Sequence, residues 1–130
     1  MKILDTDFLI AFLRGDESTK NLMEKLSREG NYATTVVNVF EVLIGAYRAK
    51  TERSARDKIQ NFVRSIDVVG LDSEVADQAA KIQAALMDKG ELLEARDVLV
   101  AAIASKYNAT IVTRNIKHFS RIVDLVVEEW

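Results

Sequence analysis

The chain has 130 residues, a length that suits one compact domain with a single hydrophobic core. Its composition, 48% apolar and 29% charged, excludes a disordered chain. The absence of cysteine excludes disulfides and thiolate metal sites, and a net charge of −2 requires any nucleic-acid binding to use a local basic patch. No apolar run approaches the roughly 20 residues of a membrane span, so we expect one cytoplasmic domain over residues 1–130.

The first part of the chain predicts two strands, the first of them followed by two helices. Residues 3–4 form a short buried strand that ends in the acidic turn Asp5-Thr6-Asp7. Helices are expected over residues 8–14 and 16–30, each stopped by a glycine, and a second brief strand is expected over 33–36. Chemistry is therefore expected where the first strand ends.

The rest of the chain continues the alternation of helices and strands. Periodicity and β-branched runs predict helices over 37–49 and onward to 65, a strand over 66–69, helices over 73–89 and 97–104, and strands over 109–113 and 125–127. This order is typical of a three-layer α/β fold, with a central, mostly parallel sheet of four to five strands flanked by helices. Ligands of such sheets bind beyond the carboxyl ends of the strands.

Three acidic residues stand where strands end or apolar helices begin or pack. Asp5 follows the first strand, Glu41 lies within an apolar helix, and Asp97 opens another. Taken singly, Asp5 could end a strand, Glu41 could pair with an arginine and Asp97 could cap a helix. Two carboxylates about 4 Å apart repel by roughly 4 kcal/mol at an effective dielectric of 20, so three that converge need a cation. Carboxylates favour a hard ion such as Mg²⁺ or Mn²⁺.

Four segments carry a resemblance to a known family. They are residues 3–10 (ILDTDFLI), 38–46 (NVFEVLIGA), 96–104 (RDVLVAAIA) and 111–119 (IVTRNIKHF). In this order and at these spacings they resemble the motifs of VapC-like PIN-domain ribonucleases, the toxins of toxin–antitoxin pairs. The resemblance covers nearly the whole chain and implies a PIN-like fold.

The resemblance also implies a metal site. It assigns Asp5, Glu41 and Asp97 as the acids that bind Mg²⁺ or Mn²⁺, with the Thr6 hydroxyl orienting Asp5 and Thr113 near the metal. The final motif departs from the family, because residue 115, two positions after the threonine, is asparagine where PIN domains often have a fourth acid. An asparagine oxygen can ligate a cation but adds no charge, which leaves a second metal open.

Other charged residues near the motifs have two interpretations each. Asp7 and Glu94 could supply the missing charge, although Asp7 could equally be a solvent-facing acid at a helix start. Arg96, Arg114 and Lys117 could hold RNA phosphates or balance local charge.

One basic segment and one histidine lie outside this set. Residues 48–64 hold six basic residues against two acids, which suggests an RNA track or a solvated helix face. His118 is expected at the surface.

These observations predict a metal-dependent endoribonuclease that hydrolyses RNA phosphodiester bonds. The resemblance further implies an antitoxin partner, and unpartnered apolar helix faces at 37–49 and 73–89 suggest a homodimer. A PIN scaffold that has lost catalysis and acts as a binding module is the alternative. A haloacid-dehalogenase-like phosphatase is a weaker one, because no strand-end lysine followed by paired aspartates accompanies Asp5-Thr6-Asp7.

Overall fold

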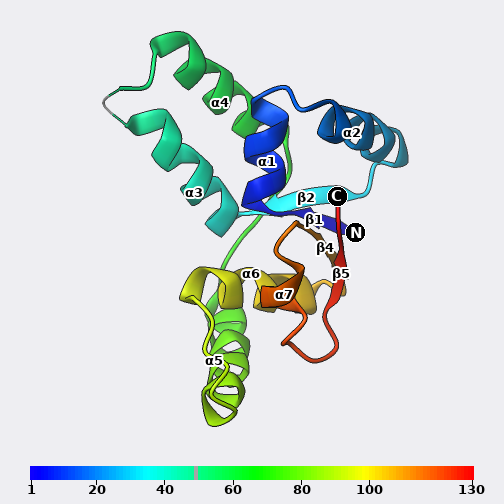
Figure 1. Cartoon of the computed structure of the whole chain (residues 1–130), viewed down its shortest axis with the longest axis vertical. Coiled ribbons are helices and arrows are strands. Elements are labelled where there is room, and N and C mark those ends of the chain that lie inside the picture. The colour runs from blue at the N-terminus through cyan, green and yellow to red at the C-terminus, as the bar shows by residue number, and fades with distance from the viewer. Residues whose placement is uncertain (49) are drawn as a thin grey trace.

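The computed structural model describes residues 1–48 and 50–130, which are built around a five-stranded sheet (Figure 1). Every pair of neighbouring strands is parallel, and the order across the sheet is β3-β2-β1-β4-β5. The strands are β1 (Lys2–Leu4), β2 (Tyr32–Thr35), β3 (Val68–Val69), β4 (Thr110–Val112) and β5 (Val126–Glu128). The predicted α/β class is confirmed, and the sheet is parallel throughout.

Helices cover both faces of the sheet and make the outer two layers (Figure 1). In chain order they are α1 (Thr6–Leu13), α2 (Glu17–Glu29), α3 (Val36–Tyr47), α4 (Arg53–Ser65), α5 (Ser73–Asp88), α6 (Ala95–Lys106) and α7 (Ile116–Phe119). α1, α2 and α4 pack on one face, and α5, α6 and α7 pack on the other. α3 contacts helices of both groups, namely α1, α4 and α6. Within the described residues, no helix combines the length and the apolar character needed to cross a bilayer.

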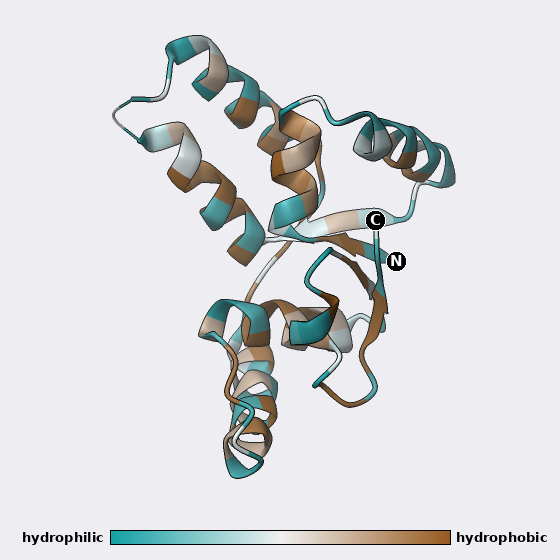
Figure 2. Cartoon of the chain, in the orientation of Figure 1, coloured by the Kyte–Doolittle hydropathy of each residue, from teal (hydrophilic) through white to brown (hydrophobic). Residues whose placement is uncertain are grey.

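The two central strands divide their side chains between the two faces. Ile3 and Ile111 belong to the apolar cluster under α5 and α6, whereas Leu4 and Val112 belong to the cluster under α1 and α2. The inner strands of a parallel sheet buried on both sides are largely apolar on both faces. Figure 2 shows β4 largely brown, β2 pale and α2 at the periphery largely teal.

The carboxyl ends of β1 and β4 form a switch point in the chain path. The two strands are paired from Lys2 and Thr110 to Leu4 and Val112. After β1 the chain enters α1 on one face, and after β4 it enters α7 on the other. Such a divergence opens a crevice at the strand ends, where α/β sheets bind their ligands.

Three helices differ from the sequence predictions. α1 begins at Thr6 rather than residue 8, because the extended backbone of Asp5 makes it the N-cap. The helix expected from residue 97 begins at Ala95, so Asp97 lies in its first turn instead of capping it. α7 was not predicted, because a helix of four residues is too short to display a periodic apolar pattern.

Candidate active site

Asp5 is the buried centre of the candidate site, with 5% of its surface exposed. Its Oδ1 accepts a hydrogen bond from Asn38 Nδ2 at 2.9 Å, and its Oδ2 accepts one from the Thr113 hydroxyl at 2.6 Å. Burial raises the pKa of Asp5 to about 6 despite the bond from Thr113, and the charges of Asp7 and Asp97 add to the increase. Asp5 is therefore a carboxylate whose negative charge the protein compensates poorly.

Asn38 holds Asp5 in place from the first turn of α3. The Thr35 hydroxyl caps this helix, accepting from the Asn38 N–H at 3.2 Å and donating to Asn38 Oδ1 at 2.6 Å. The amide group of Asn38 is thereby turned toward Asp5 and also lies 3.0 Å from Thr6 Oγ1. Sequence reasoning gave Asn38 no role, although it stands one helical turn before Glu41, on the same face of the helix.

Glu41 is held between a hydroxyl and a guanidinium. Its Oε1 accepts from the Thr6 hydroxyl at 2.9 Å, and its Oε2 accepts from Arg96 Nη1 at 2.7 Å. Arg96 also donates to Glu94 Oε2 at 2.7 Å. The Thr6 hydroxyl therefore orients Glu41, whereas the family resemblance implied that it orients Asp5. The cationic partner expected for Glu41 is present as Arg96.

Asp97 faces the site from the first turn of α6. Its Oδ2 lies 3.0 Å from Nδ1 of His118 in α7, a distance that permits a hydrogen bond when this nitrogen carries the proton. The His118 side chain is 47% exposed, as the sequence predicted, but its contact with Asp97 was not foreseen. Because the charge of Asp97 raises the pKa of Asp5, the two carboxylates face a common region.

The three predicted metal ligands come from different elements: Asp5 follows β1, Glu41 lies on α3 and Asp97 lies on α6. In residues 1–48 and 50–130, no three aspartate, glutamate or histidine side chains are grouped as a ready-made metal site. Glu41 and Asp97 are instead engaged by Arg96 and His118. Asp5 fits a hard divalent cation, because its carboxylate is an oxygen donor whose charge is poorly compensated. The three-acid ligand set stays a prediction.

The comparison with known proteins decides the family. The model of the PIN domain family matches residues 2–125. The chain belongs to the PIN-domain family. Ribonuclease VapC of Rickettsia bellii (strain RML369-C) is 33% identical over 132 residues, which cover 96% of this chain and 92% of the relative. Ribonuclease VapC2 of Rickettsia felis is 27% identical over 129 residues, which cover 98% of this chain and 96% of the relative.

Solved structures agree with this PIN-domain assignment. One of them is the crystal structure of VapBC2 from Rickettsia felis, bound to a DNA fragment from its promoter. It superposes on this chain with a TM-score of 0.90 at 25% sequence identity, and the match covers 99% of this chain and 98% of that chain. The VapC-like resemblance and the three-layer fold are confirmed. The turn Asp5-Thr6-Asp7 is thus part of a PIN domain and not of a haloacid-dehalogenase-like phosphatase.

Asp7 of this PIN domain joins several chain segments. Its Oδ2 accepts from the Arg114 N–H at 2.8 Å and lies 3.2 Å from the Thr113 hydroxyl. Its Oδ1 accepts from the Phe8 N–H at 2.6 Å and from Trp130 Nε1 at 3.2 Å. Asp7 is close enough to raise the pKa of Asp5, but all its recorded partners are donors of the fold itself. The contact of Trp130 with Asp7 was not predicted from the sequence.

Glu94, the other candidate for the missing charge, and Asn115, which replaces the family's fourth acid, lie farther out. Glu94 is the N-cap residue of α6, and its side chain is 69% exposed and paired with Arg96. Among the described residues, the recorded side-chain contact of Glu94 is with that arginine. Asn115 is exposed, and its backbone N–H donates to Thr113 Oγ1 at 3.0 Å. Asn115 therefore helps to position the threonine that holds Asp5.

The candidate phosphate-binding residues separate into different environments. Arg96 bridges Glu41 and Glu94, which favours the local charge-balance interpretation. Lys117 is exposed on α7, and no ion pair of its side chain is recorded among the described residues. Arg114 stacks on the indole of Trp130, with its Cζ 3.6 Å from the ring centroid.

The basic segment over 48–64 contributes in part to packing. Arg56 Nε donates to the Ala46 carbonyl at 3.0 Å, and Lys58 Nζ donates to the Leu13 carbonyl at 2.7 Å. These bonds fasten α4 to α3 and α1, so two of the six basic residues have structural roles.

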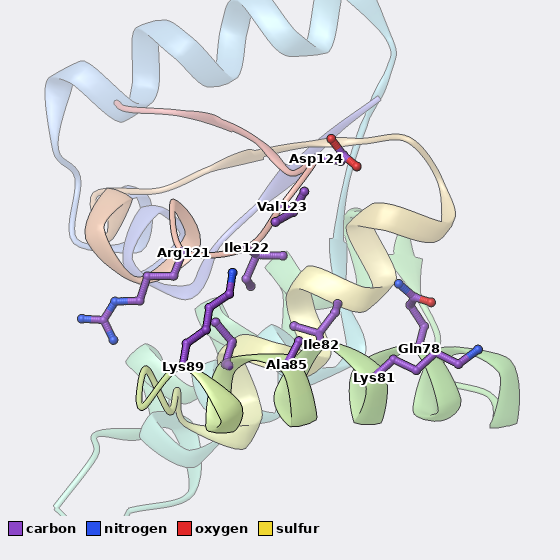
Figure 3. A pocket seen from close by; sticks show the side chains of 10 residues that line it. Gln78, Lys81, Ile82, Ala85, Lys89, Arg121, Ile122, Val123 and Asp124 are labelled. Carbon is purple, nitrogen blue, oxygen red and sulfur yellow. The ribbon is translucent and has the colours of Figure 1, made fainter.

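A separate hollow lies between α5 and residues 121–124 (Figure 3). It encloses about 300 Å³ and has an apolar floor that includes Ile82 and Ile122, with Lys89 and Arg121 at its rim. None of the predicted site residues lines it. This hollow is therefore distinct from the candidate active site.

Proposed function

We propose that this PIN domain, formed by residues 1–130, is an endoribonuclease that uses Asp5, Glu41 and Asp97 to bind Mg²⁺ or Mn²⁺. The observation that carries the proposal is the state of Asp5. It is buried at the switch point of a parallel sheet, fixed through both oxygens, and its pKa is raised to about 6 with Asp97 nearby. A site of this kind is stabilised by a cation that neutralises its charge.

A divalent cation held there supplies charge neutralisation at the phosphoryl group and makes water more acidic at neutral pH. The chain's own residues prepare the ligands. Asn38 and Thr113 fix the two oxygens of Asp5, and Thr6 fixes one oxygen of Glu41. Because these donors are in place before substrate arrives, little reorganisation is needed during the reaction.

The proposal includes a protein partner and a cellular role. The similar structure from Rickettsia felis is a VapBC2 assembly, bound to promoter DNA. We therefore propose that this chain is the toxin of a toxin–antitoxin pair that acts on cytoplasmic RNA and is held inactive by its antitoxin.

The test is cleavage of a labelled RNA mixture by the purified, partner-free protein with Mg²⁺, Mn²⁺ or EDTA. The test variant is Asp97→Asn, and the matched control is Asp77→Asn, an exposed aspartate in a surface ion pair on α5. Because loss of one predicted ligand weakens cation binding, we expect Asp97→Asn to lower cleavage at least about 100-fold. The control should cleave within about twofold of wild type, because exposed ion pairs contribute little.

Three results would contradict the proposal. Metal-independent cleavage, or full activity of Asp97→Asn, would exclude the assigned site. RNA binding without cleavage by folded wild-type protein would instead favour a catalytically inactive binding scaffold, the alternative raised by Asn115.

A further inference from the structure

A groove of about 680 Å³ lies beside the candidate site, between α1 and Trp130. Ile10 and Ala11 form part of its apolar wall, and Arg14 and Arg114 contribute its cations. Asp7 belongs both to this groove and to the surroundings of Asp5. We call this hollow the Arg114 groove.

The two sites are joined through one hydroxyl. Thr113 Oγ1 lies 2.6 Å from an oxygen of Asp5 and 3.2 Å from an oxygen of Asp7. A ligand that occupied the Arg114 groove would therefore lie next to the predicted metal ligands.

Three contacts hold Arg114 in position. Its N–H is bound by Asp7, its guanidinium lies 3.6 Å from the Trp130 ring centroid, and its Nε is 3.4 Å from the Trp130 carbonyl oxygen. The indole is itself fixed by Asp7 and by an edge-on contact with Phe8, at 5.5 Å between ring centroids. A guanidinium fixed by stacking loses little conformational entropy when it binds an anion.

The groove contains two carboxylates and two guanidiniums, so its formal charges cancel. The two kinds of group differ in the partners that the fold gives them. Both oxygens of Asp7 accept from donors of the fold. Asp16 accepts from the N–H groups of Ser18 and Thr19 as the cap of α2. All of these bonds to the Asp16 carboxylate end on Oδ1. The hydrogen bond from the Ser18 side chain lowers the pKa of Asp16, and the charge of Arg114 contributes to lowering it. In contrast, no ion pair of Arg14 or Arg114 is recorded among the described residues. The groove therefore presents two guanidiniums without a recorded ion pair, and guanidiniums are donors that bind phosphate.

We propose that the Arg114 groove binds the nucleotide next to the scissile phosphodiester of single-stranded RNA. Arg114 and Arg14 bind its phosphate, and the apolar wall of Ile10 and Ala11 packs against its sugar and base. Trp130 is a positioning residue, because one face of its ring is covered by Arg114. The inference rests on the proposed ribonuclease function and specifies where the substrate strand continues from the site.

The groove favours RNA over a carboxylate of a protein partner for a geometric reason. A guanidinium binds phosphate and carboxylate alike, so charge alone does not distinguish the two. The link through Asp7 and Thr113 places the groove beside the predicted cleavage centre, where an RNA strand must supply neighbouring phosphates. A carboxylate of a protein partner does not have to bind next to the predicted cleavage centre.

The experiment measures binding of a fluorescein-labelled, single-stranded RNA in EDTA, where metal-dependent cleavage is stopped. Wild type is compared with Arg114→Gln, Arg114→Lys and Arg14→Gln, and Arg121→Gln, at the rim of the hollow in Figure 3, is the matched control. We expect Arg114→Gln to weaken binding about fivefold to tenfold. The slope of log K against log salt concentration should become shallower by about 0.7, the value for one phosphate contact on a single strand. Arg114→Lys should retain the salt dependence with weaker binding, and Arg121→Gln should bind within about twofold of wild type.

Cleavage assays on the same variants separate this inference from the proposed function. Arg114→Gln should raise KM about fivefold with little change in kcat, because it removes binding and leaves the metal ligands intact. If Arg114→Gln and Arg121→Gln had the same RNA affinity and the same KM, and wild type cleaved RNA, the proposed role of the groove would be wrong. The proposed ribonuclease function would still hold. RNA binding that depends on Arg114, without any cleavage, would support the groove as an RNA-binding surface and contradict the proposed ribonuclease function. Weakened binding of a co-purified antitoxin, with unchanged RNA binding, would assign the groove to the protein partner and contradict the inference.

Discussion

At the scale of single residues, Asp5 shows how the site departs from what is best for folding. A carboxyl group that is nearly fully buried is more stable when protonated, and its pKa is raised from 3.8 to about 6. The folded state therefore binds this proton more tightly than the unfolded state. The contribution of Asp5 to the free energy of unfolding is therefore fully present below about pH 4 and is lost as the pH rises through the folded pKa of about 6.

Asp5→Asn should make the protein more stable at neutral pH. A shift of about 2 pKa units corresponds to about 3 kcal/mol, which is the upper figure for the gain at pH 7.5. The amide oxygen can still accept from Asn38, and the Thr113 hydroxyl can turn to Asp7, which is 3.2 Å away. The advantage should shrink toward pH 4, where Asp5 is protonated. Urea denaturation at both pH values measures it.

The control for this prediction is Asp57→Asn, an exposed aspartate on α4. It should change the free energy of unfolding by less than about 0.5 kcal/mol at either pH. A destabilised Asp5→Asn at pH 7.5 would mean that the ionised carboxylate contributes to folding, contrary to the burial argument.

Sequence reasoning named the acids of the candidate site, and the family resemblance added Thr6 and Thr113, but Asn38 was missed. Asp5, Glu41 and Asp97 were identifiable because acids are unusual at strand ends and in apolar helices. Asn38 carries no charge and lies within a helical run, so nothing local distinguished it from a surface amide. Its role depends on the spatial proximity of β1 and α3. This proximity arises because β1 pairs with β2, the strand that precedes α3.

At the scale of elements, α3 is the described helix that exposes the most large apolar side chains. It buries Val42 and Ala46 against its neighbours, yet it exposes Val36, Phe40 and Ile44 by 41%, 59% and 46%. A hollow of about 600 Å³ with an almost wholly apolar lining follows this face. α5 differs, because its buried residues pack against α6 and its one large exposed apolar residue is Met87. The sequence suggested both helices as dimer contacts, and the observed exposure favours α3.

We expect the exposed face of α3 to pair two copies of the chain with two-fold symmetry. Burying these side chains against themselves removes apolar surface from water in both copies. Light scattering after size exclusion should give about twice 14.6 kDa for wild type. The double variant Phe40→Ser with Ile44→Ser should elute as a folded monomer.

The matched control is Val123→Ser, which removes an apolar residue that is 73% exposed and lies outside α3. It should remain dimeric. A monomeric wild type at micromolar concentration would exclude the pairing, and loss of the dimer in the control would indicate a different interface.

At the scale of the whole molecule, the parallel sheet was predictable from the sequence. The contact that Trp130 makes with α1, which we call the closure of the fold, was not. Alternating strands and helices specify a parallel sheet, because each crossover needs a helix. The contact of Trp130 with α1 joins residues 123 positions apart at Asp7 and follows no local pattern. Trp130 extends from the end of β5 over the strand ends to the apolar cluster that holds Phe8.

Trp130→Ala should therefore destabilise the entire domain, because it removes the packing that joins the two ends of the described chain. A half-buried tryptophan with an aromatic contact and one hydrogen bond corresponds to about 2 kcal/mol, below the 3–5 kcal/mol of a fully buried one. Circular dichroism during urea denaturation measures the loss, with Tyr107→Ala, an aromatic residue 47% exposed, as the control. Trp130 is the sole tryptophan, so in wild type its fluorescence reports this closure directly. Coincident fluorescence and dichroism transitions would show that the closure unfolds with the core, whereas an earlier fluorescence transition would mean that the Trp130 contact opens on its own and stabilises only the groove.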